Sequence, residues 1–230
     1  MAGTNQNLKP QTFEIAKPYV IVCEGNDDMH FLGYYLHFLD KSKLIDEQKF
    51  KIIKTEGVDN IPKNMKLFKN YDHYEYMKGF LFIRDADNNP SSAVDSMIGN
   101  IKDVWNIKLD RTGTFKTDSE GVKLSFFLFP GLDNSNNFQK GTLEDLCTET
   151  FKPVIGNNHN ILDLVEEHMD KLKNRGIHFK TPHKNRLHLC LDSTNDFLGD
   201  KIGESAKKQA FDFSSDKFSI LKERIIDLAR

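Results

Sequence analysis

The chain has 230 residues, of which 38% are hydrophobic and 29% charged, and its formal net charge is −2. This length and composition are typical of a globular protein with a sizeable core, and they exclude a disordered or fibrous protein. No apolar run approaches the roughly 20 residues needed to cross a bilayer, and the polar N-terminus lacks a signal-like segment, so we expect a cytoplasmic protein without a membrane partner.

The first half of the chain alternates predicted strands with predicted helices. Apolar runs predict strands at residues 19–23, 50–54, 79–83 and 124–129. Amphipathic segments predict helices from residue 27 or 28 to about 40, from 59 or 60 to about 71, and from about 91 to 105. Because each connection between strands is long enough for a helix, the pattern favours a parallel sheet.

The second half is predicted to be mainly helical. Residues 112–121 form an exposed loop or hairpin before the fourth strand, and a polar loop at 133–140 leads to a helix capped by Thr142. Further helices are predicted at 161–173, 183–191 and 215–228. We therefore expect an α/β fold, Rossmann-like, with a mainly parallel sheet of about four strands flanked by helices and a helical C-terminal elaboration.

In terms of organisation, we predict one α/β domain and not two independent domains. Residues 1–16 would form an N-terminal tail, residues 17–150 the α/β core, and residues 151–230 the helical elaboration packed on that core. The three cysteines are far apart and form no Cys-x-x-Cys pair, so we expect reduced, packed thiols and no zinc site.

Acidic residues stand where two of the predicted strands end. Glu24 follows the first strand, and Asp85 and Asp87 follow the third. The carboxyl ends of parallel strands meet at one edge of a sheet, so these side chains can converge on a divalent metal such as Mg²⁺. If the backbone stays extended, Asp85 and Asp87 point to the same side, whereas Arg84 points to the opposite face.

Acidic residues before a helix are more often caps than ligands, and capping is the favoured interpretation for Asp27, Asp28 and Asp59. Asp85 and Asp87 differ, because two carboxylates so close together after an apolar strand repel one another unless a cation lies between them.

Two basic segments are candidate surfaces for nucleic acid. Lys63, Lys66 and Lys69 recur at three-residue spacing on a predicted helix, and residues 171–186 contain no acidic residue. The second segment includes Lys173, Arg175, Lys180 and Lys184. Since the net charge gives no general attraction to nucleic acid, a local surface of this kind would be needed.

Glu24-Gly25 together with Asp85-Ala86-Asp87 resembles the signature of the Toprim domain, which topoisomerases, bacterial-type primases and nucleases of the recombination and OLD (overcoming lysogenization defect) groups share. The resemblance covers roughly residues 17–130. It is strongest to small stand-alone Toprim-like proteins and OLD-type nucleases, and the run from Glu24 to Asp28 before an apolar helix is similar to the opening of the stand-alone proteins.

The resemblance implies roles for individual residues. Glu24 would be the acid/base or metal-linked glutamate, and Asp85 and Asp87 would bind Mg²⁺, for which Mn²⁺ can substitute. Weaker additions are Asp28, Glu144 and Asp145, and the available candidates for a catalytic lysine are Lys201, Lys207 and Lys208.

The leading hypothesis is a metal-dependent phosphoryl-transfer enzyme, a nuclease acting on DNA or RNA. The alternative is a non-catalytic Toprim-like subunit that binds nucleotide or nucleic acid beside an ATPase partner, docking through an exposed apolar patch at residues 218–228. A phosphatase of the haloacid-dehalogenase type is disfavoured, because Asn89 stands where those enzymes resemble one another in a Thr or Val and because Glu24 would have no role.

Overall fold

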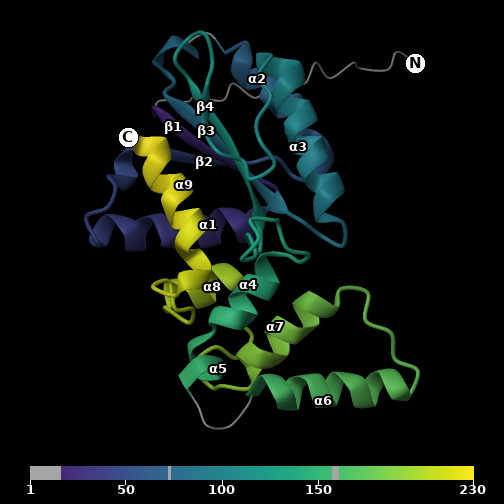
Figure 1. The fold of residues 1–230 in the computed structure, drawn as a ribbon. Coiled ribbons are helices and arrows are strands. Elements are labelled where there is room, and N and C mark those ends of the chain that lie inside the picture. The colour runs from purple at the N-terminus through teal and green to yellow at the C-terminus, as the bar shows by residue number, and fades with distance from the viewer. Residues whose placement is uncertain (1–16, 72–73, 157–160) are drawn as a thin grey trace, which may run out of the picture.

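The computed structural model describes residues 17–71, 74–156 and 161–230, so the predicted tail at residues 1–16 lies outside the described residues. Its centre is a five-stranded sheet with the order β2-β1-β3-β5-β4 (Figure 1). The strands are β1 (Tyr19–Cys23), β2 (Phe50–Lys54), β3 (Gly79–Asp85), β4 (Lys116–Thr117) and β5 (Lys123–Phe129). All neighbours pair in parallel except β4, which is antiparallel to β5.

The predicted α/β class and the mainly parallel sheet are confirmed. The short strand β4 is the hairpin partner that the Gly- and Thr-rich segment before β5 supplies. Strand β3 runs two residues beyond its predicted end, because Arg84 and Asp85 still pair with Leu128 and Phe129 of β5. Asp85 is therefore held by the sheet itself.

Helices cover both faces of the sheet. The helices of the described residues are α1 (Asn26–Lys41), α2 (Ile61–Lys69), α3 (Pro90–Trp105), α4 (Leu143–Thr150), α5 (Lys152–Gly156), α6 (Ile161–Asn174), α7 (Pro182–Asp192), α8 (Ile202–Lys207) and α9 (Ser219–Ala229), and not all of them contact the sheet. On one face Phe80 of β3 packs against Phe68 of α2 and Trp105 of α3. On the other, Phe31 of α1 packs against Phe129 of β5.

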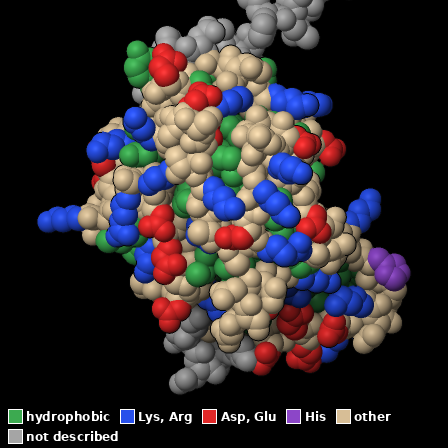
Figure 2. Space-filling view, turned by 45° about the horizontal axis from the view of Figure 1, so that its top comes forward, with side chains coloured by type: hydrophobic (Ala, Val, Ile, Leu, Met, Phe, Trp, Pro, Cys, Tyr) green, Lys and Arg blue, Asp and Glu red, His purple; other side chains and the backbone are tan. Residues whose placement is uncertain are grey.

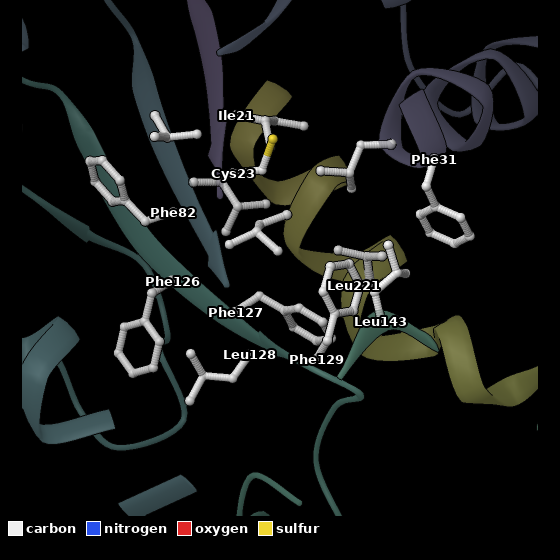
Figure 3. Packing of buried hydrophobic residues seen from close by; sticks show 14 of the residues in the cluster. Ile21, Cys23, Phe31, Phe82, Phe126, Phe127, Leu128, Phe129, Leu143 and Leu221 are labelled. Atoms are coloured by element: carbon white, nitrogen blue, oxygen red, sulfur yellow. The ribbon is translucent and has the colours of Figure 1, made fainter. Parts of the chain in front are cut away.

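Side-chain alternation along the strands separates these two layers of the core. Figure 3 shows Phe82 and Phe126 on one side of the sheet, and Phe31, Phe129 and Leu221 on the other. All five side chains are almost completely buried. The apolar strands of the sequence therefore form a sheet buried on both faces, which is the usual state of parallel strands.

Helix α9 returns to the sheet and packs against β3 and β5 (Figure 1). Its apolar residues Leu221, Ile225 and Leu228, and Phe218 directly before it, are at most 1% exposed. The expectation of an exposed docking patch at residues 218–228 is therefore wrong, because this apolar face closes one side of the core. Helix α9 belongs to the sheet layers, while α5, α6 and α7 stand beyond α4, away from the sheet.

Replacing Leu221 by Ala is expected to lower the free energy of unfolding by about 2–5 kcal/mol, because it removes a fully buried side chain at the contact between α9 and the sheet. Chemical denaturation measures the change. Glu223→Ala, on the exposed side of the same helix, is the matched control and should change stability by less than about 0.5 kcal/mol. Equal effects of the two substitutions would contradict the packing of α9.

Of the helices in the described part of the chain, none is long and apolar enough to cross a bilayer. Cys23, Cys147 and Cys190 are buried and form no disulfide, as the spacing of the cysteines predicted.

Candidate active site

Four carboxylates gather at the carboxyl edge of the sheet. Glu24 follows β1, Asp28 lies in the first turn of α1, Asp85 ends β3, and Glu144 lies in the first turn of α4. The charges of Asp28, Glu144 and Glu24 all act on Asp85. These four residues, called the acidic cluster below, come from separate elements, and the parallel topology brings them together.

Asp85 is the most strongly perturbed member of the acidic cluster. Burial raises the pKa of Asp85 to about 8, and the negative charges of Asp28 and Glu144 add to the increase. Its Oδ1 accepts a hydrogen bond of 2.9 Å from the backbone N–H of Leu143, which partly offsets the shift. Asp85 therefore holds the beginning of α4 against the end of β3.

Asp28 and Glu144 are close enough to Asp85 for their charges to raise its pKa. Asp28 Oδ2 accepts a hydrogen bond of 2.8 Å from the N–H of Gly25. Asp28 therefore helps to cap α1 from its third position, whereas the N-cap that was expected at Asp27 or Asp28 is Gly25. Burial raises the pKa of Asp28 to about 6, and Glu144 contributes in the same direction. Glu144 is itself only 5% exposed. Asp28 thus helps to cap α1 and also adds negative charge near Asp85.

Glu24 forms an ion pair with Arg84, but one of its carboxylate oxygens accepts no hydrogen bond within the described residues. Its Oε1 lies 3.3 Å from Arg84 Nε, yet this buried oxygen has no hydrogen bond within the described residues. Burial raises the pKa of Glu24 to about 7, Arg84 acts against this shift, and Asp28 adds to it. The side chain is 23% exposed, so it remains open to solvent.

Arg84 points away from Asp85, as strand alternation predicts, but this direction leads it to Glu24. Val22 of β1 pairs with Phe82 of β3, and the same register two residues later places Glu24 beside Arg84. Glu24 itself lies one residue beyond the end of β1, so its side chain is not restricted to one face of the sheet. Arg84, which was expected on the face of the sheet opposite Asp85 and Asp87, therefore contacts both Glu24 and Asp87.

Asp87 does not join Asp85, and the expectation of an extended segment between them is wrong. Asp87 has a φ of 54° and exchanges backbone hydrogen bonds with Gly141, at 2.9 and 3.0 Å. Its side chain is 61% exposed and its Oδ2 lies 3.4 Å from Arg84 Nη2. Pairing with the loop that leads to α4 thus turns the chain and carries this carboxylate to the side of Arg84.

The loop at residues 133–140 is consequently part of the architecture of the site. It delivers Gly141, which pairs with Asp87, and Leu143, which binds Asp85. Gly141 has a φ of 140°, and a Cβ there would lie 2.8 Å from Asp145 Oδ2. A glycine is needed at this close approach because an L side chain would meet both backbone strain and a steric clash.

Helix α7 supplies two cations that the sequence analysis did not assign to the site. Lys184 Nζ lies 3.4 Å from Glu144 Oε1. Arg186 forms ion pairs with Asp145 at 3.2 Å and with Glu166 at 2.5 Å. Asp145 also accepts a hydrogen bond from the N–H of Thr142, the predicted cap. This carboxylate therefore links the beginning of α4 to Arg186 of α7. No sequence signal links Lys184 to Glu144, because the packing of α4 on α7 creates the contact.

The two predicted nucleic-acid surfaces contain both paired and exposed cations. Lys69 forms ion pairs with Asp118 and Glu120, whereas Lys63 and Lys66 are exposed. Lys173 pairs with Asp170, whereas Arg175 is exposed. On the face in Figure 2, Lys and Arg side chains are interspersed with Asp and Glu and form no single basic patch.

Within the described residues, none of the candidate catalytic lysines forms an ion pair with a carboxylate of the acidic cluster. Lys208 pairs with Asp200 at 2.9 Å, and Lys201 is an exposed residue at the beginning of α8. Lys207 lines a pocket with Lys41, at the opposite end of α1 from Asp28.

A pocket of about 410 Å³ lies beside the acidic cluster, on the face of the sheet that α2 and α3 cover. Arg84 and Asp87 line it together with Asn89, Ser92 and Ser96 of the following segment. Arg84 thus contacts Glu24 and at the same time presents a positive charge to the pocket.

Among residues 17–71, 74–156 and 161–230, no three His, Cys, Asp or Glu side chains are grouped so that they could jointly hold a metal ion. Mg²⁺ often takes only one or two protein carboxylates and completes its shell with water and phosphate. The oxygen donors of Glu24 and Asp85 match that chemistry.

The fold and the site define a mixed α/β protein with buried carboxylates at the carboxyl edge of a mostly parallel sheet. A family model described as protein of unknown function (DUF3226) matches residues 18–229, and the chain therefore belongs to this family. No curated protein and no solved structure matches the chain.

Proposed function

We propose that the protein is a Mg²⁺-dependent phosphoryl-transfer enzyme, a nuclease that cleaves DNA or RNA, with Mn²⁺ able to replace Mg²⁺. The observation that carries this proposal is the charge balance of the acidic cluster. Glu24, Asp28, Asp85 and Glu144 are opposed by Arg84 and Lys184, and Arg84 is shared with Asp87. Ionised carboxylates in excess of their counter-ions favour the binding of a divalent cation.

The donor set fits a hard cation. Glu24 Oε1 is buried without a hydrogen bond, and Asp85 uses Oδ1 for the N–H of Leu143. Glu24 and Asp85 would hold the metal, with Asp28 and Glu144 adding negative charge around it. A metal bound there supplies charge stabilisation to the phosphoryl group that is transferred.

The chain's own residues supply binding and proton transfer. Arg84 lies at the wall of the 410 Å³ pocket, where its guanidinium can bind phosphate oxygens. Glu24 would have one of two roles, either holding the metal beside Asp85 or moving a proton. In the second role its metal-free pKa of about 7 suits a group that takes a proton from an attacking water and returns it near neutral pH. Lys184 neutralises part of the charge of Glu144 and so limits the repulsion that Asp85 experiences.

The resemblance of Glu24-Gly25 and Asp85-Ala86-Asp87 to the Toprim signature supports the same chemistry, although Asp87 is paired with Arg84 in this structure. In the proposal, exposed cations such as Lys63, Lys66 and Arg175 track the nucleic-acid backbone. Contacts of this kind carry little sequence preference and weaken steeply with salt.

The proposal predicts that Glu24→Gln lowers Mg²⁺-dependent cleavage of labelled single- and double-stranded DNA and RNA by about 100-fold or more, since it removes a proton acceptor. Cleavage by the wild-type protein should stop in EDTA and return with Mn²⁺. Glu223→Gln, on the exposed side of α9, is the matched control.

A crystal soaked in Mn²⁺ adds a readout that does not depend on activity, namely an anomalous peak beside Glu24 and Asp85. Absence of both the peak and cleavage would overturn the proposal. A protein that binds Mn²⁺ and nucleic acid but never cleaves would instead support the non-catalytic alternative.

A further inference from the structure

A second pocket of about 420 Å³ lies at the far end of α1, between that helix, the beginning of α5 and the segment that follows α8. Lys41 and Asp28 are 13 residues apart on α1, which corresponds to about 20 Å along the helix axis. No residue of the acidic cluster lines this pocket, and nothing in the proposed function uses it.

Three lysines from three elements line this pocket. Lys41 is the last residue of α1, Lys152 the first of α5, and Lys207 the last of α8. None of them forms an ion pair with any residue that the structure describes. The one carboxylate in the lining is Asp212, whose Oδ1 already accepts hydrogen bonds from the N–H and Oγ of Ser214.

The helix dipole explains the positions of two of these three lysines but not of the third. A lysine in the last turn of a helix is favoured by the helix dipole, which accounts for Lys41 and Lys207. Lys152 stands at the beginning of α5, where the same effect is unfavourable. The three positive charges share one concave site, and an anion bound between them would relieve their mutual repulsion.

Aromatic rings form another part of the wall. Tyr34 and Phe38 of α1 are partly exposed at the pocket, and Phe211 and Phe213 lie buried beneath it. Phe213 packs on Phe38 at a centroid distance of 5.6 Å, so the ring of Phe38 is held in place by the core. A partly exposed ring with a fixed position can stack on a planar base.

We propose that this pocket binds a nucleoside phosphate, with the phosphate between the lysines and the base against Tyr34 and Phe38. A cavity of this volume lies within the range of small-molecule sites, roughly 300–1,000 Å³, and suits one nucleotide. Inorganic phosphate alone would leave the aromatic wall unused, and a strand of nucleic acid would need an open groove.

The test is calorimetric titration of the full chain in EDTA with AMP, GMP, CMP and UMP, which keeps divalent metal away from the acidic cluster. At least one of these nucleotides should bind at least tenfold more tightly than ribose 5-phosphate and than its own nucleoside. The double substitution Lys41→Gln with Lys152→Gln should weaken that binding at least tenfold. Lys102→Gln, an exposed lysine in the last turn of α3, is the matched control and should leave binding unchanged.

Three results with mononucleotides and ribose 5-phosphate would overturn the assignment. They are failure of all four nucleotides to bind, equal binding of ribose 5-phosphate, and undiminished binding by the double variant. An oligonucleotide that binds tenfold more tightly than every mononucleotide, and that loses binding in the same variant, would assign the site to a strand end and overturn the proposal of a free nucleotide. Because the titration contains no metal, its result is independent of the proposed nuclease activity.

Discussion

Replacing Asp85 by Asn is expected to lower Mg²⁺-dependent cleavage by about 100- to 1,000-fold while the fold is retained. The amide oxygen of Asn can still accept the hydrogen bond that Asp85 receives from Leu143, so the junction between β3 and α4 should survive. The negative charge that would bind the metal is lost. Initial rates at saturating Mg²⁺, with circular dichroism as a measure of folding, provide the test.

Asp103→Asn is the matched control for this experiment, because Asp103 is an exposed residue on α3 and lies outside the acidic cluster. It should cleave at the wild-type rate. Full Mg²⁺-dependent activity in a folded Asp85→Asn protein would show that Asp85 does not take part in the chemistry, and the proposed function would fail with it.

The free energy of unfolding of the metal-free protein is expected to fall as the pH rises from about 4 to 8. Burial and neighbouring carboxylates raise the pKa of Asp85 from 3.8 to about 8, and burial raises the pKa of Glu24 from 4.5 to about 7. Between these limits the folded state holds protons that the unfolded state has released. The stabilisation is therefore complete below about pH 4 and is lost by about pH 8, at up to about 1.4 kcal/mol per pH unit for each proton.

Urea denaturation at pH 5, 6.5 and 8 in EDTA measures this dependence. Asp85→Asn should flatten the curve because it removes the largest contribution, whereas Asp103→Asn should leave the curve unchanged. Mg²⁺ should restore stability at pH 8, since a ligand that binds only the folded state stabilises it. A wild-type stability that rises with pH over this range would contradict the burial of excess carboxylates.

Much of the fold could be predicted from local pattern. The run from Tyr19 to Cys23 matched β1 at both ends, and Pro62 lies within the first turn of α2 as expected. These features depend on apolar periodicity and on the geometry of proline, which act over a few residues. The strand ends also located Glu24 and Asp85, because a parallel sheet carries its carboxyl ends to one edge.

The remaining features of the site depend on contacts between distant segments. Glu144 reaches Asp85 because Leu143 is hydrogen-bonded to that carboxylate, and Lys184 reaches Glu144 because α7 packs on α4. Asp87 leaves the expected side through its pairing with Gly141. No periodicity in the sequence encodes these partners, so tertiary packing decides them.

The return of α9 to β3 and β5 has a consequence for synthesis on the ribosome. A nascent chain that has emerged only as far as β5 has every strand that the structure describes, but it lacks the helix that covers Phe127 and neighbouring residues on one side. That apolar surface stays open while α4 to α8 are translated. During this interval the incomplete polypeptide is exposed to aggregation and is a natural client for chaperones.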